Sequence, residues 1–201
     1  HFADRDLLIT SIGNVVRVCA DKLVFEIIIP LSFVKKVLCR YRFVRRLLRL
    51  DKMNVTVADK QSISLFIIYQ GLIFNYIKGG KLLPIFKLKH GRNVLHNSIA
   101  IIPSDSIIFG EYFGNNAGLP VNIYKIDFLT MKCRRVYTFP AKAIRHVHSC
   151  CYDKFEKKIW VFTGDYDGEC KVLVSDLDFK NVSILGDGTQ TWRAVSAFFT
   201  K

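Results

Sequence analysis

The stretch that decides the fold runs from Ile144 to Asp167 and reads IRHVHSCCYDKFEKKIWVFTGDYD. It matches an earlier stretch, VLHNSIAIIPSDSIIFGEYF, at residues 94–113. Each has a histidine-bearing apolar segment, a polar turn, and a second apolar segment that ends on a glycine and an acid. Runs of β-branched and aromatic residues bounded by turn residues are typical of strands, so each stretch predicts a β-hairpin.

A second hairpin follows each of these. The segment IYKIDFLTMKCRRVYTF at 123–139 parallels VLVSDLDFKNVSILG at 172–186, and IFNYIKGGKLLPIFKLK at 73–89 is a weaker copy. The equivalent positions recur about every 50 residues, which with four strands per unit is typical of a β-propeller. The sequence therefore predicts an all-β chain: a β-propeller with four-stranded blades at residues 61–201. Residues 1–60 would supply divergent N-terminal strands and a basic segment of the same domain.

The number of copies is small for a closed propeller. Two and a half to three units are visible, and the final segment WRAVSAFFTK at 192–201 matches the first strand of another blade. We therefore expect an incomplete propeller, a fragment of a longer one. The alternative is that residues 1–60 supply the missing strands.

About half of the net charge of +13 lies in one segment, FVKKVLCRYRFVRRLLRLDK, where Lys35–Lys52 holds eight positive charges and one negative charge. Basic and apolar residues alternate there, which predicts an amphipathic element with a basic outer face. No nucleic-acid motif accompanies the charge, so we expect no specific nucleic-acid binding. A solvated face and a contact with phosphate or anionic lipid both remain open. No apolar run approaches the roughly 18 residues of a transmembrane helix, so no transmembrane segment is expected.

The six cysteines have no C-x-x-C spacing, and the first residues do not follow the order of a signal peptide. We expect reduced, mostly buried thiols, a cytoplasmic location and no cofactor. His146 and His148 share one face of a predicted strand. No second pair of ligands stands near them in the sequence, so the sequence predicts no metal site.

A resemblance to a known family comes from the turn Ser175-Asp176-Leu177-Asp178-Phe179. It keeps the Ser and the Asp of the Ser-x-Asp-x-Gly-x-x-Trp motif, although the Gly and the Trp are missing. Together with RHVHSCCYD, IWVFTGDYDGEC and GTQTWRAV, this turn resembles the sialidase-like (BNR/Asp-box) β-propeller proteins of the uncharacterised branch. The resemblance covers roughly residues 60–201. It implies a propeller fold, carbohydrate binding and a glycosyl hydrolase-like activity.

One arginine follows each copy of the repeat: Arg92, Arg145 and Arg193. Equivalent positions in successive blades lie around one axis, and guanidinium groups bind planar anions with two hydrogen bonds. These arginines are therefore candidates for binding a carbohydrate or another anionic small ligand at the channel mouth, with Trp192 stacking on a sugar. The alternative is that each arginine joins its blade to the next.

Two carboxylates, Glu111 and Asp165, follow the glycines that end the second strand of two units. A pair of carboxylates can hydrolyse a glycoside, and His146 and His148 could support proton transfer. These four residues are the catalytic candidates, unless their side chains only bind neighbouring backbone. The rival function is a non-catalytic propeller scaffold, in which strand edges and Lys35–Lys52 contact a protein or an anionic surface.

Overall fold

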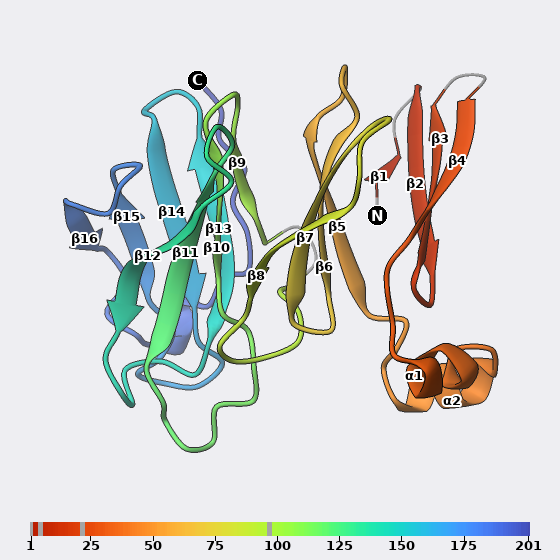
Figure 1. Cartoon of the computed structure of the whole chain (residues 1–201). Coiled ribbons are helices and arrows are strands. Elements are labelled where there is room, and N and C mark those ends of the chain that lie inside the picture. The colour runs from red at the N-terminus through yellow and green to blue at the C-terminus, as the bar shows by residue number, and fades with distance from the viewer. Residues whose placement is uncertain (1, 4–5, 21–22, 96–97) are drawn as a thin grey trace. The chain divides into compact units, whose positions relative to one another are not determined.

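The computed structural model describes residues 2–3, 6–20, 23–95 and 98–201. The chain divides into two compact units, His1–Lys87 and Leu88–Lys201. Within the described residues, each unit contains two four-stranded antiparallel sheets, and the strands of each sheet are neighbours in chain order (Figure 1). The predicted all-β class and the four-stranded sheets are confirmed. Among the described helices, none is both long and apolar enough to cross a bilayer.

The first unit holds two sheets that share one core. Leu7 and Ile9 on one sheet and Val55 and Leu65 on the other belong to the same buried cluster. In β2, Leu7 and Ile9 are buried while Leu8 is exposed, the alternation expected of a strand with one face on a core. The strands are β1 (Phe2–Ala3), β2 (Leu7–Ile12), β3 (Val15–Ala20) and β4 (Leu23–Ile28), then β5 (Met53–Asp59), β6 (Ser64–Tyr69), β7 (Leu72–Ile77) and β8 (Leu83–Lys87).

The basic segment forms two short helices that come between β4 and β5 in the chain, α1 (Phe33–Leu38) and α2 (Arg42–Leu47). Neither helix contains a buried residue. Phe33 and Phe43 are 81% and 77% exposed, so apolar side chains as well as basic ones face outward. The predicted amphipathic element is therefore a helical pair that leaves several apolar side chains uncovered, Phe33 and Phe43 among them.

The second unit repeats the plan of the first, and the four hairpins recognised in the sequence supply its strands. Ile108 and Ile123 on one sheet and Val161 and Leu173 on the other belong to one buried cluster. The strands are β9 (Ala100–Ile102), β10 (Ser106–Gly110), β11 (Val121–Asp127) and β12 (Cys133–Phe139), then β13 (Val147–Asp153), β14 (Lys158–Thr163), β15 (Val172–Ser175) and β16 (Val182–Ile184), followed by the 3-10 helix η1 (Gln190–Trp192).

The two sheets of the second unit meet where β13 packs against β10. Gly110 ends β10, and a Cβ at this position would overlap the Cβ and both methyl groups of Val147. One residue further on, the Glu111 carbonyl accepts a hydrogen bond from the Val147 amide at 3.0 Å. The absence of a side chain at Gly110 is therefore what lets β13 approach β10 this closely.

A buried lysine joins the same two sheets. The Nζ atom of Lys125, on β11, lies 3.2 Å from Asp105 and 3.2 Å from Asp178. Asp178 belongs to the turn between β15 and β16, so this ion pair crosses from one sheet to the other. Its lysine side chain is only 8% exposed, and a buried charge needs such partners.

We predict that Gly110→Ala destabilises the protein, because the added methyl group overpacks the contact with Val147. The free energy of unfolding should fall by about 1–3 kcal/mol in urea or guanidinium titrations. Gly114→Ala is the matched control, since no atom lies within 4 Å of a Cβ built there. Equal stability of the two variants would contradict the close packing.

Candidate functional site

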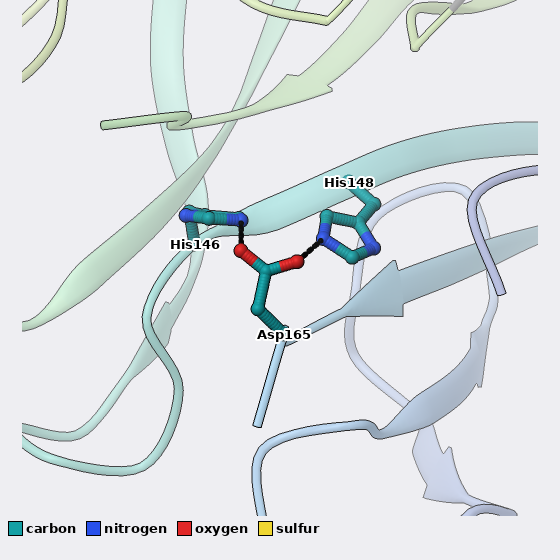
Figure 2. Close-up of side chains that lie close together, drawn as sticks. All are labelled: His146, His148 and Asp165. Atoms are coloured by element: carbon teal, nitrogen blue, oxygen red, sulfur yellow. Dashed lines mark hydrogen bonds and ion pairs between the residues drawn. The ribbon is translucent and has the colours of Figure 1, made fainter. Parts of the chain in front are cut away.

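Three side chains of the second unit converge at one end of the β13–β14 hairpin: His146, His148 and Asp165 (Figure 2). Val147 pairs with Thr163, so the start of β13 lies beside the end of β14. Asp165 follows β14 through Gly164, which has a φ of 78°. A Cβ on Gly164 would overlap the Glu169 carbonyl, so the turn that presents Asp165 requires glycine.

The Asp165 carboxylate lies between the two imidazoles, with one oxygen toward each (Figure 2). His146 Nε2 is 3.2 Å from Asp165 Oδ2, and His148 Nε2 is 3.1 Å from Asp165 Oδ1. The imidazole ring centroids are 5.1 Å apart. The His-x-His spacing therefore places both rings on the same side, as the sequence predicted.

The other nitrogen of each ring faces a backbone carbonyl. His146 Nδ1 is 3.2 Å from the Phe113 carbonyl oxygen, and His148 Nδ1 is 3.2 Å from that of Ala194. A carbonyl accepts a hydrogen bond and cannot donate one, so these two contacts are hydrogen bonds in the ring forms that carry a proton on Nδ1. In the neutral imidazoles Nε2 is then the atom with the lone pair, and it is Nε2 that faces Asp165 in both cases.

The two imidazoles are buried, while Asp165 reaches solvent. The histidine side chains are 5% and 4% exposed, against 33% for Asp165. Burial lowers the pKa of His146 below its ordinary value, although the Phe113 carbonyl and Asp165 act in the opposite direction. The Tyr112 ring, whose centroid lies 4.3 Å from that of His146, contributes to this burial. The cluster thus has an enclosed nitrogen side and an open carboxylate side.

Two of the three predicted arginines lie at this cluster. Arg193 Nη2 is 3.5 Å from Asp165 Oδ1, and the Arg193 side chain is 52% exposed. Arg145 stacks on the Tyr166 ring, with its guanidinium carbon 4.4 Å from the ring centroid. The buried Nε of Arg145 has no hydrogen-bond partner among the described residues. Arg92 is exposed, and in the part of the chain that the structure describes its side chain makes no hydrogen bond or ion pair with the cluster.

Glu111 is placed differently from Asp165. It is fully buried, and its carboxylate accepts hydrogen bonds from the Asn122 amide and side chain, both at 2.9 Å. The Tyr124 hydroxyl at 3.2 Å and the His90 amide at 3.3 Å complete the set. Burial and the neighbouring Glu111 raise the pKa of Tyr124, so its hydroxyl stays a donor. This carboxylate is enclosed by four donors of its own sheet and its preceding loop.

The C-terminal segment closes one side of the cluster. Trp192 lies against Gly186 and is 39% exposed. Gln190 Nε2 donates a hydrogen bond to the Asp165 carbonyl at 3.1 Å, which holds the Asp165 loop. The sequence did not indicate Gln190, Tyr166 or the carbonyl of Ala194 as parts of the site. The sequence pattern that did indicate the site was a His-x-His spacing followed by an acid at the end of the partner strand.

Comparison with known proteins does not assign the chain to a family. No family model matches it, and no curated protein matches it. One solved structure to which it is similar is the AtxE2 isopeptidase in its apo form, at 11% sequence identity and a TM-score of 0.38. The match covers 89% of this chain and 25% of the isopeptidase chain, so this chain spans about a quarter of that protein.

We predict that Glu111→Ala lowers the free energy of unfolding by about 3 kcal/mol or more, because it leaves buried donors without an acceptor. Glu111→Gln keeps one acceptor oxygen and should have a smaller effect in the same denaturant titration. Glu156→Gln, in an exposed turn, serves as the control. A Glu111→Gln protein of full stability that loses only a catalytic activity would instead make Glu111 catalytic.

Proposed function

We propose that the chain forms successive blades of a β-propeller related to the sialidase-like Asp-box proteins, and that it binds an anionic small ligand of the carbohydrate class beside Asp165. The support for the propeller is the repeated plan of four consecutive antiparallel strands per sheet. The support for the ligand is the pair of arginines, Arg145 and Arg193, at the same cluster.

The turns that carry the Asp-box resemblance behave alike. Asp176, between β15 and β16, accepts hydrogen bonds from the amides of Asp178, Lys180 and Asn181. Asp127, at the equivalent turn between β11 and β12, accepts them from the amide and hydroxyl of Thr130. Burial acts to raise the pKa of Asp176, but the hydrogen bonds together outweigh it, and hydrogen bonding likewise holds the pKa of Asp127 below the ordinary value. Equivalent acids therefore organise equivalent turns, which favours a repeat.

The observation on which the ligand proposal depends is that the Arg145 side chain is positioned by an aromatic ring but has no anionic partner in the described part of the chain. Its guanidinium is fixed by stacking on Tyr166, yet it makes no ion pair with any described residue. A pre-positioned guanidinium loses little freedom when it binds a carboxylate or phosphate, and such bonds are among the stronger ones in proteins. Arg193, half-exposed beside Asp165, is a second cation at the same place. Trp192 adds an accessible ring in the same segment.

The proposal is for binding, with glycoside hydrolysis as a further activity of the same site to be tested. A two-carboxylate mechanism needs both carboxylates at the sugar. Asp165 is accessible, whereas Glu111 is enclosed. Proton transfer would therefore depend on Asp165 with His146 and His148, and Glu111 would act only by supporting the sheet.

We predict that Arg145→Ala weakens binding of an acidic sugar about tenfold or more, because charge-assisted hydrogen bonds are lost. Calorimetric titration with sialic acid, a uronic acid and neutral sugars would measure the effect. Arg92→Ala is the matched control, since Arg92 is exposed and its side chain makes no hydrogen bond or ion pair with the cluster among the described residues. Equal losses for both arginines, or no binding of any acidic sugar by the unmodified protein, would count against the proposal.

A second candidate function is contact with an anionic surface through α1 and α2. The exposed aromatic rings of Phe33 and Phe43 stand among exposed cations, a combination that suits insertion at the boundary between lipid head groups and chains. Arg45 is an exception in this segment. It pairs with Asp51 and donates to the Cys39 carbonyl, so its charge is used inside the protein.

We predict that replacing Lys35, Lys36, Arg42 and Arg46 by glutamine weakens binding to phosphatidylserine-containing vesicles by about two orders of magnitude or more, since each nearby cation contributes about 1 kcal/mol. Vesicle co-sedimentation at fixed salt measures this. The control of equal net charge replaces four other exposed lysines, Lys132, Lys154, Lys157 and Lys180. Equal behaviour of the two variants would attribute binding to overall charge alone.

A further inference from the structure

The cluster in Figure 2 brings together three groups that all accept hydrogen bonds. With both Nδ1 protons donated to the Phe113 and Ala194 carbonyls, the Nε2 atoms of neutral His146 and His148 carry lone pairs and lie 3.2 and 3.1 Å from the Asp165 carboxylate. When the imidazoles are neutral, none of these three groups supplies a proton to the space between them. Such an arrangement is unfavourable unless a cation occupies the space between them or the imidazoles take up a second proton.

The separations of the three atoms suit a metal ion. Ligand atoms bonded to one zinc-sized ion at about 2.0–2.2 Å, with angles between octahedral and tetrahedral, lie about 2.8–3.6 Å apart. His146 Nε2 lies 3.2 Å from Oδ2 and His148 Nε2 lies 3.1 Å from Oδ1 of Asp165, so both separations fall in this range, although they end on different oxygens of the carboxylate. All three candidate ligand atoms lie within 4.8 Å of one another. A small closing movement would bring them around one ion.

The surroundings also match those of metal-binding histidines. Such histidines commonly donate the second ring N–H to a backbone carbonyl, which fixes the tautomer and the ring orientation. Both rings do this here. His146 Nε2 is buried and lies 3.2 Å from Asp165, but it makes no contact with hydrogen-bond geometry to any described residue, so it is an unsatisfied ligand atom at the cluster.

We infer that His146, His148 and Asp165 bind one divalent transition-metal ion of the zinc or iron(II) class through two imidazole nitrogens and one carboxylate oxygen. Three protein ligands leave coordination positions for water or a substrate, the plan of catalytic zinc sites and of non-haem iron sites. Imidazole ligands disfavour calcium and magnesium, which prefer oxygen. This inference does not depend on the proposed sugar ligand, because it concerns only the groups inside the cluster.

The competing explanation is that the imidazoles are protonated and form an ion-paired network with Asp165. In that case His148 would donate from both nitrogens, to Ala194 and to Asp165, and no metal would be needed. Arg193, 3.5 Å from the same carboxylate oxygen, would add to this network. The two explanations differ in whether added metal is bound at these residues.

The experiment uses the full chain, treated with chelator and dialysed, with no sugar present. Calorimetric titration with Zn²⁺ and visible absorption with Co²⁺ measure binding and ligand type. We expect one ion per chain, a rise in the melting temperature with Zn²⁺, and d–d bands without a thiolate charge-transfer band. His148→Asn and Asp165→Asn should each weaken binding about tenfold or more. His90→Asn, which alters a histidine stacked on Phe113 outside the cluster, should bind as the unmodified protein does.

Three results would overturn the inference: no binding by the unmodified protein, equal binding by Asp165→Asn, or a thiolate band that places the ion at a cysteine. Because His148 is buried, its variant could fail to fold. Asp165→Asn keeps the side-chain size at a partly exposed position, and the melting temperature of each metal-free variant verifies that it is folded. A loss of acidic-sugar binding without a loss of Zn²⁺ binding would affect only the proposed function.

Discussion

The close approach of β13 to the end of β10 is the constraint on which the second unit depends. It requires a glycine at 110, because any side chain there would occupy the place of Val147. The same contact continues along the chain: the Glu111 carbonyl binds the Val147 amide, and the Phe113 carbonyl faces His146 Nδ1. The segment that joins the two sheets therefore also orients one imidazole of the cluster.

The second imidazole is oriented by a segment that lies later in the chain, near its C-terminus. His148 Nδ1 faces the Ala194 carbonyl, beyond η1, and Gln190 holds the Asp165 carbonyl. Each ring is thus fixed by backbone from a different part of the chain, while Asp165 enters from a glycine-dependent turn. Backbone carbonyls keep their place more strictly than long side chains do, so the ring nitrogens are well positioned.

Much of the fold was readable in the sequence because it depends on local patterns. The four hairpins of the second unit follow from β-branched runs and turn residues, and the repeat indicated that they pair into equivalent sheets. The His-x-His spacing placed two rings on one side of a strand for the same reason. In the basic segment, the alternation of basic and apolar residues did not show that Phe33 and Phe43 stay exposed, since burial depends on what packs against a helix.

The chemistry of the cluster was less readable, because it depends on contacts between distant residues. Glu111 and Asp165 hold equivalent places after equivalent glycines, yet one is enclosed by four donors and the other is open. The difference comes from Asn122 and Tyr124 on β11, whose side chains reach Glu111. Similarly, the metal site was not predicted, because the sequence gives neither the protonated ring nitrogen nor the convergence of Asp165 on both rings.

The charges around the cluster relate the two proposals for this site. Among the described residues, Asp165 is the acid in direct contact with the two imidazoles, while Arg145 and Arg193 bring two positive charges nearby. A divalent ion held by the cluster would increase this excess of positive charge at the open carboxylate side. This excess of positive charge favours an anion that bridges the metal ion and the arginines. The metal-bound protein would then bind the acidic ligand more tightly, and the protein with the acidic ligand bound would bind the metal ion more tightly. By linkage that coupling is reciprocal, so a metal-bound cluster and an acidic ligand stabilise one another.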